Sequence, residues 1–131
     1  MNGESDLKTL LASMSPKLVD GEFVFCTFPD AGYGDHSELD PVAAIKESEG
    51  LALVVPRSKA DDRSLPYESV FRQITLMIHS SLDAVGLTAA VASRLADHGI
   101  SANVVAGYYH DHIFVPVEAA EQALGALKEQ V

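Results

Sequence analysis

The segment Val70–His79, written VFRQITLMIH, alternates between apolar and other side chains, and this pattern limits what the second half of the chain can fold into. Because successive side chains of a strand point to opposite faces, the alternation predicts a strand with one apolar face. That face needs a second layer packed against it. The predicted apolar face carries Ile74, Leu76 and Ile78, and the opposite face carries Gln73, Thr75, Met77 and His79.

A helix, a hairpin and a second helix are predicted after this strand. Apolar residues at four-residue spacing predict a helix over Leu87–His98. The segments ISANVVA and HIFVPV predict two strands joined by the turn GYYHD. Helices that follow strands of one sheet cover the same face, so this order predicts an α+β sandwich of two layers. The last helix is expected to bury Val117, Ala120, Leu124 and Leu127.

The first half of the chain predicts similar elements in a different order. A helix capped by Ser5 carries an apolar stripe that ends at Met14. The segment GEFVFCTF predicts a strand, and a loop follows from Pro29 to Pro41. The segments VAAIKE and LALVVP predict a hairpin, and RSKADDRSL predicts a short helix. The segment LPYES is the expected boundary, which divides the chain into residues 1–66 and 67–131.

Composition excludes several classes of partner. The net charge is −10, from 19 acidic and 9 basic residues, so we expect no binding to nucleic acid or to an anionic membrane. No apolar run approaches the roughly 20 residues that a membrane-spanning helix needs. The N-terminus lacks a secretion signal, and Cys26 is the single cysteine. We therefore expect a cytoplasmic protein without a disulfide framework.

The order of elements in the second half, with DAVGL after the first strand and GISANVV after the first helix, resembles the ACT domain. The long string from LPYES to HIFVP, together with FVFCTFPD and EGLALVVP, resembles a family of small uncharacterised bacterial ACT-domain proteins. The resemblance implies a ferredoxin-like (ACT) two-layer sandwich in two ACT-like halves, with antiparallel sheets and helices on one face. ACT domains bind amino acids and similar small ligands, usually between two modules, so a homodimer is also expected.

One strand of the implied βαββαβ pattern is missing from residues 67–131. After the hairpin the sequence predicts a helix that runs to Val131, and no fourth strand follows it. We expect a strand of the first half, within Glu22–Phe28 or Leu51–Val55, to complete the second sheet.

The turn between His79 and Leu87 is the candidate ligand site. The first N–H groups of a helix have no partners within it, and they favour an anion such as a carboxylate. By resemblance, Asp83 and Gly86 match the ACT Asp-x-x-Gly turn, and Asn103 takes the place of an asparagine in the second ACT strand. Simple capping of the helix also explains such a turn. The candidate ligand-binding residues are His79, Ser81, Asp83, Ala84, Val85, Gly86, Leu87, Asn103, Tyr108, His110 and His112.

The histidines allow a second interpretation, a metal site. His110 and His112 lie two residues apart and would project to one side of an extended chain. His79 is a possible third ligand, and Asp111 or Asp83 a fourth. Neither H-E-x-x-H nor C-x-x-C is present, so we favour a polar hairpin tip and expect no metal and no cofactor.

No constellation of a nucleophile with its base is evident in the sequence, so we expect no catalysis. We interpret the chain as a regulatory or sensor protein that binds an amino acid or a related metabolite. The first alternative is a structural or interaction protein with a vestigial ligand site, which would use the face carrying Gln73, Thr75 and Met77. The second alternative is a metal-binding protein centred on the histidines.

Overall fold

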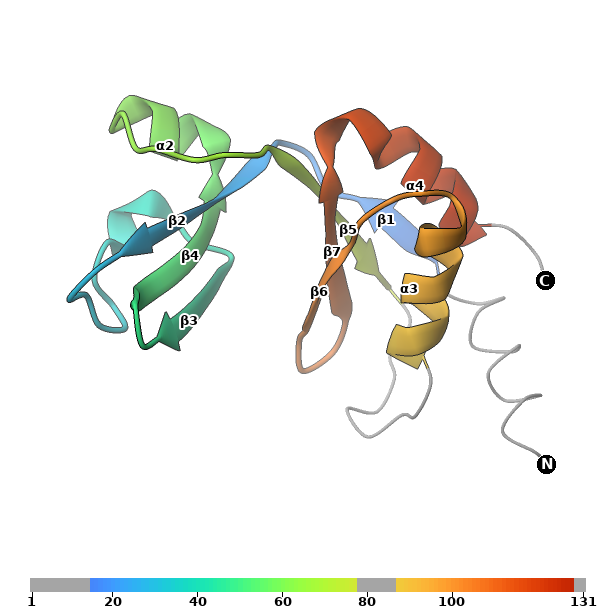
Figure 1. Ribbon diagram of the computed structural model, residues 1–131, viewed down its shortest axis with the longest axis horizontal. Coiled ribbons are helices and arrows are strands. Elements are labelled where there is room, and N and C mark those ends of the chain that lie inside the picture. The colour runs from blue at the N-terminus through green and yellow to red at the C-terminus, as the bar shows by residue number, and fades with distance from the viewer. Residues whose placement is uncertain (1–14, 78–86, 129–131) are drawn as a thin grey trace. The chain divides into compact units, whose positions relative to one another are not determined.

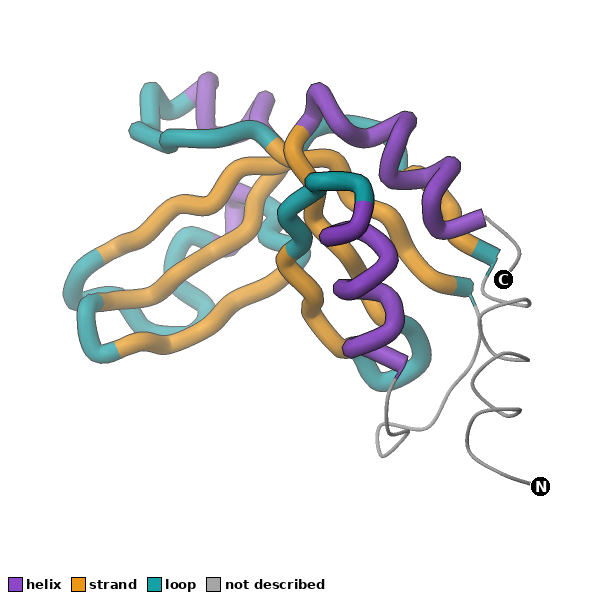
Figure 2. Tube along the Cα trace, turned by 45° about the vertical axis from the view of Figure 1, so that its right-hand side comes forward, coloured by secondary structure: helices purple, strands orange, loops and turns teal. Residues whose placement is uncertain are grey.

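The computed structural model describes residues 15–77 and 87–128 (Figures 1 and 2). The chain divides into two compact units, one of Met1–Asp20 with Arg72–Val131, the other of Gly21–Phe71. The helix predicted from Ser5 to Met14 and the predicted ligand turn lie outside the described residues. In the described part of the chain, no helix is long and apolar enough to cross a membrane.

The unit containing Arg72–Val131 is a sheet with helices packed on one of its faces. Its strands lie in the order β1, β5, β7, β6, and β6 pairs with β7 in antiparallel register, with Val105 opposite His112. The helices follow their strands as the sequence predicts. The elements are β1 (Pro16–Leu18), β5 (Phe71–Leu76), α3 (Leu87–Asp97), β6 (Asn103–Ala106), β7 (Asp111–Pro116), the short 3-10 helix η2 (Val117–Ala119) and α4 (Ala120–Lys128).

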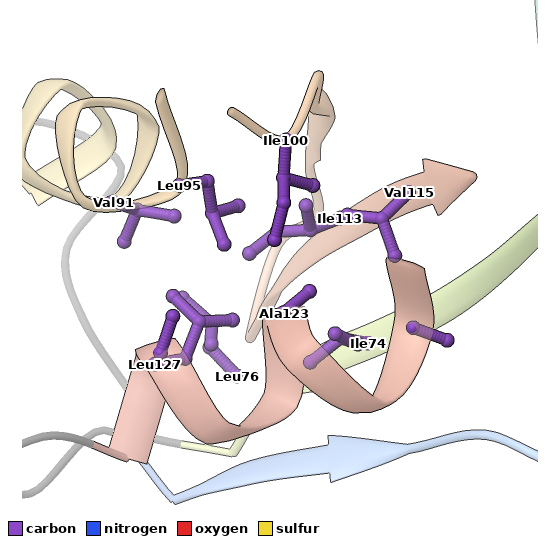
Figure 3. Packing of buried hydrophobic residues seen from close by; sticks show 11 residues of the cluster. Ile74, Leu76, Val91, Leu95, Ile100, Ile113, Val115, Ala123 and Leu127 are labelled. Atoms are coloured by element: carbon purple, nitrogen blue, oxygen red, sulfur yellow. The ribbon is translucent and has the colours of Figure 1, made fainter. Parts of the chain in front are cut away.

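The core of this unit lies between the sheet and the helices α3 and α4 (Figure 3). Ile74 and Leu76 are almost fully buried, which confirms the predicted apolar face of β5 for these two residues. The sheet and both helices contribute to one continuous cluster. Its buried members are Ile74, Leu76, Val91, Leu95, Ile100, Ile113, Val115, Ala120, Ala123, Ala126 and Leu127.

The buried face of the last helix differs in part from the prediction. Ala120 and Leu127 are buried as expected, whereas Val117 and Leu124 are only partly buried. The reason is that Val117 belongs to η2, so the α-helix begins at Ala120 and turns Ala123 into the core. Small alanines at this face let α4 lie close to the sheet.

The strand that pairs with β5 over several residues is β1, which lies outside both segments that we expected to complete the sheet. Pro16, Lys17 and Leu18 pair with Leu76, Thr75 and Ile74. The neighbouring backbone extends the contact, because the N–H of Val19 donates to the carbonyl of Gln73 at 2.9 Å. By contrast, β2 meets β5 at the single pair Phe23–Phe71. Three residues are too few to show an alternating pattern, and proline at the first position of a strand costs no ladder hydrogen bond.

The unit Gly21–Phe71 is built on three antiparallel strands in the order β3, β4, β2. The predicted hairpin and the predicted short helix after it are both present. The pair Glu47–Gly50 closes a two-residue turn between β3 and β4. The elements are β2 (Phe23–Phe28), the 3-10 helix η1 (Ser37–Leu39), β3 (Ala43–Glu47), β4 (Gly50–Pro56) and α2 (Arg57–Asp62). The expected α+β architecture with antiparallel strands is therefore confirmed, and the boundary at residues 66 and 67 stays a prediction.

Polar contacts around Arg57 fasten the chain after α2 back onto this unit. The guanidinium of Arg57 donates to Glu22 Oε1 at 2.8 Å and to the hydroxyl of Tyr67 at 3.1 Å. That hydroxyl in turn donates to Asp61 Oδ1 at 2.7 Å. The hydrogen bonds to Glu22 and then to Tyr67 raise the pKa of Arg57, which stays charged. The network ties the start of β2 to the segment that leads into β5.

Replacing Leu95 by alanine should destabilise the unit that carries the candidate site. Leu95 is fully buried between α3 and the sheet, and truncation leaves a cavity as well as losing apolar contact. We expect the free energy of unfolding to fall by about 3 kcal/mol in urea denaturation. Ser93→Ala, an exposed change in the same helix, should shift it by less than about 0.5 kcal/mol. Equal effects of the two changes would contradict this account of the core.

Candidate functional site

The structure describes five of the eleven predicted ligand-binding residues. Leu87 is the first residue of α3, and Asn103 the first of β6. Tyr108, His110 and His112 belong to the tip and the returning strand of the β6–β7 hairpin. The remaining candidates lie outside the described residues: His79, Ser81, Asp83, Ala84, Val85 and Gly86.

The tip of the β6–β7 hairpin is a tight turn, as the sequence predicts. The N–H of Gly107 donates to the carbonyl of His110 at 2.9 Å and closes the turn. Tyr108 is 74% exposed, and its ring meets that of Tyr109 edge-on with the centroids 5.0 Å apart. The tip therefore presents an aromatic pair to its surroundings, with the histidines at its base.

His112 is tied to β5 by a polar cluster in which Gln73 and Thr75 are buried. Its Nδ1 lies 3.0 Å from the hydroxyl of Thr75 and 3.3 Å from Nε2 of Gln73. The Gln73 amide nitrogen also donates to the Thr75 hydroxyl at 3.1 Å. An amide nitrogen can only donate, so Nδ1 accepts and the imidazole is neutral, with its proton on Nε2. We call Gln73, Thr75 and His112 the polar cluster.

Gly107 is required by the close approach of the turn to His112. A Cβ at this position would lie 2.8 Å from the carbonyl oxygen of His110 and 3.1 Å from Nε2 of His112. Any other residue would push the turn and the imidazole apart. The position of the hairpin tip is thus fixed to β5 through His112.

Folding lowers the pKa of His112. Burial of the imidazole is the main cause, and the nearby His110 adds to it, while Asp111 opposes both. Nδ1 of His110 is itself buried, and it has no hydrogen-bond partner among the described residues. The base of the tip thus favours neutral imidazole at His112.

The predicted interaction face of β5 is wrong for two of its three residues. Gln73 and Thr75 are only 9% and 7% exposed, because they take part in the polar cluster, whereas Met77 is 44% exposed. The sequence-based prediction placed all three side chains on an open surface, because no hydrogen-bond partner on a neighbouring strand had been identified for them. The relevant signal was the alternation of β7, which puts His112 on the face opposite Ile113.

Asn103 does not join the hairpin tip within one chain. It opens β6 and pairs with Phe114, whereas the tip begins after Ala106, at the other end of the strand. At about 3.4 Å per residue, the four residues from Asn103 to Gly107 place Asn103 roughly 14 Å from the tip.

In the described residues no metal-binding group is found, and the thiol of Cys26 is not activated. In residues 15–77 and 87–128, no three histidine, cysteine, aspartate or glutamate side chains are grouped so as to hold a metal ion. Cys26 lies buried in β2, with its sulfur 3.9 Å from the carbonyl of Pro66. Burial raises the pKa of Cys26, which favours the unreactive thiol over the thiolate.

Models of the ACT-domain family match almost the whole sequence. One ACT-domain model matches residues 2–72 and a second matches residues 68–129. The chain belongs to the ACT-domain family. The two matches make it a tandem ACT protein, and comparison with curated proteins finds no match.

Solved structures support this assignment. The tandem ACT protein is 52% identical to a Vibrio cholerae protein of unknown function, described as a possible transport protein, with 99% of each chain covered and a TM-score of 0.89. An Agrobacterium tumefaciens protein is 17% identical, with 86% of this chain and 84% of that chain covered and a TM-score of 0.71. The ligand-free regulatory subunit of aspartate kinase from Thermus thermophilus is 13% identical, with 92% and 98% covered and a TM-score of 0.65. At such low identity, the last two likenesses show the fold alone.

Removing the imidazole of His112 should weaken the pH dependence of stability. A base whose pKa is lowered by folding takes up protons more readily in the unfolded chain. Stability is therefore lost as the pH falls below the unfolded value of about 6.5, until the lowered folded pKa is passed. His112→Gln should lose less stability than the wild type between about pH 7.5 and about pH 5 in urea denaturation. His36→Gln serves as the control, and an unchanged pH dependence in His112→Gln would refute the assignment.

Proposed function

We propose that this tandem ACT protein is a non-catalytic sensor that binds an amino acid or a related small metabolite at the turn before α3. The observation that carries the proposal is the family match, because ACT domains typically bind such metabolites and a match spans residues 68–129, around this turn. Membership of the family supports a class of ligand, but it does not identify the ligand.

The N-terminal end of α3 suits a carboxylate in this proposal. The first turn of α3 carries no acidic side chain that would compete for the helix dipole. In the proposed complex, amides around Ala84–Leu87 bind the carboxylate, and Ser81 or Asp83 orients the ammonium. Asn103 lies at the far end of β6 from the hairpin tip, so we assign it no part in a site formed by one chain.

The polar cluster supports the second wall of the proposed site. Thr75 stands next to the last residue of β5, after which the chain enters the turn, and it binds His112 directly. The β6–β7 tip is therefore held at the end of the sheet where β5 gives way to the turn. In the proposal, the exposed ring of Tyr108 contacts the ligand side chain, and His110 and His112 position the tip.

A regulatory role follows if ligand binding is coupled to the packing of modules, including those of a second copy in a homodimer. A ligand shifts such an equilibrium only by its difference in affinity for the two states. The competing function is an interaction protein whose turn only caps α3. The two differ in whether a small molecule stabilises the native state.

A thermal-shift screen of dialysed protein against the common amino acids and their close analogues tests the proposal. A ligand that binds only the native state stabilises it by about 2.7 kcal/mol at a hundredfold excess over its dissociation constant. A selective rise in melting temperature is expected for one amino acid or a related group of them. A uniform absence of shifts would favour the interaction protein.

Changes in the turn should abolish binding of the amino acid found in that screen. Gly86→Val fills the space where a ligand approaches the backbone, and Asp83→Ala removes the carboxylate proposed to orient the ammonium. Isothermal titration should show affinity reduced at least about tenfold for each, equivalent to about 1.4 kcal/mol. Asp97→Ala, at the other end of α3, is the matched control and should bind normally. Unchanged affinity in a folded Gly86→Val protein would eliminate the turn as the site.

A further inference from the structure

The polar cluster is arranged for a neutral imidazole and not for a charged one. Nδ1 of His112 lies 3.3 Å from Nε2 of Gln73, an amide nitrogen that can only donate hydrogen bonds. A proton on Nδ1 would point a second N–H at this amide. The Thr75 hydroxyl, 3.0 Å from Nδ1, can accept from that proton, but it then loses Nδ1 as its own acceptor. Protonation of His112 therefore breaks the contact with Gln73 and sets two donors against each other.

The described groups around His112 do not compensate for a positive charge on its ring. Val105 of β6 stands opposite His112, and its hydrogen-bond partners on β5 are uncharged. Lys17 of β1, whose partner in β5 belongs to the cluster, adds a cation on the same face of the sheet. Burial does most to lower the pKa of His112, the charge on His110 acts in the same direction, and Asp111 opposes both. Among the residues that the structure describes, the balance favours the neutral ring.

His112 also connects the hairpin tip to β5. Its Nδ1 binds the side chains of β5, while its Nε2 lies against the turn, 3.1 Å from where a Cβ on Gly107 would stand. The turn is closed by its own hydrogen bond between Gly107 and His110, so it keeps its shape as a unit. The next residue of β7, Ile113, is fully buried in the core. A change at His112 can therefore move the tip while the packing from Ile113 onward stays in place.

We propose that the β6–β7 tip is a proton-sensitive element, attached to β5 while His112 is neutral and released from β5 when the ring is protonated. Only the contacts of the cluster and the turn are lost, so this local opening costs less than unfolding of the unit. On release the ring regains the ordinary proton affinity of histidine, and acid therefore draws the equilibrium toward the released tip. Attachment is fully present above about pH 6.5, the ordinary pKa of histidine, and is lost progressively below it.

The release of the tip needs no bound ligand, so it does not depend on the proposed function. One consequence does rest on that function. If the turn before α3 binds an amino acid, release removes the second wall of the site, and the affinity for that amino acid falls in acid. The two proposals can fail separately, because a tip that responds to pH in a chain that binds no amino acid would support the release alone.

The test follows the ligand-free, full-length chain by NMR between about pH 7.5 and about pH 5. The ring nitrogen shifts of His112 report its protonation, and the amide shifts of Gly107–Asp111 report the position of the tip. We expect both to change with one midpoint, below about pH 6.5. The amide order parameters of the tip should fall from about 0.85, typical of a rigid backbone, toward about 0.6. The order parameter of Leu95, in the core, should not change.

Two histidine variants assign the response to one ring. His112→Gln keeps an oxygen that can accept from Gln73 but cannot be protonated in this range, so its tip should no longer respond to pH. His110→Gln is the matched control, because it removes the neighbouring imidazole and leaves the cluster intact. Its tip should still respond, at a slightly higher pH than in the wild type, since a nearby positive charge is lost. The amide of Leu95 verifies that each variant is folded.

A second pair of variants tests the donor on β5. Gln73→Glu replaces the amide by a carboxylate, which accepts a hydrogen bond from protonated Nδ1 and should keep the tip attached at pH 5. Gln122→Glu adds the same charge at an exposed position of α4, and its tip should be released as in the wild type.

Three results would overturn the proposal. The first is protonation of the His112 ring with no change in the shifts or order parameters of the tip. The second is a pH response of the tip that persists in His112→Gln, which would assign the response to another group. The third is release of the tip at the same pH in Gln73→Glu and Gln122→Glu, which would show that the cluster does not hold the tip.

Discussion

Burial of one face of β5 is the constraint on which the unit containing α3 and α4 depends. Ile74 and Leu76 are packed under both helices, and their burial fixes which way every other side chain of the strand points. A shift of the register by one residue would exchange the two faces, so the apolar residues specify the register strongly. Gln73 and Thr75 are consequently placed on the opposite face, where they are also removed from solvent.

Gln73 and Thr75 must also find hydrogen-bond partners within the protein, since buried polar groups need them. His112, on β7, supplies the hydrogen-bond partner for both side chains. Gly107 lets the hairpin turn lie directly against the imidazole of His112. The same contacts thus provide hydrogen bonds for the buried polar side chains of β5 and position the hairpin tip. Replacing any one partner would leave a buried donor or acceptor unpaired, which is more costly than the hydrogen bond itself is worth. The part of the chain proposed to contact a ligand is therefore supported by the core.

The sequence predicts the long helices and strands well. It predicts poorly the shortest strand and the contacts that depend on residues far apart in the chain. Strong periodicity locates β5, α3 and α4 to within a few residues, and the turn chemistry of GYYHD locates the hairpin tip. The strand β1 was missed because it comes just after the predicted helix, whose apolar stripe ends at Met14, and three residues carry no pattern. The burial of Gln73 and Thr75 was missed because it depends on a residue about 40 positions away, His112. The alternation of β7 indicates which face of its strand His112 occupies, but local patterns do not show which strand lies beside it.

The most direct test of the account is a map of amide chemical shifts for the full chain with the amino acid that stabilises it most. The account predicts that amides of Ala84–Leu87 and of the tip Gly107–His110 shift together, with one dissociation constant, because one ligand contacts both. Shifts at the turn without any at the tip would contradict the proposed second wall. An amino acid that stabilises the protein while shifting neither segment would contradict the assignment of the site.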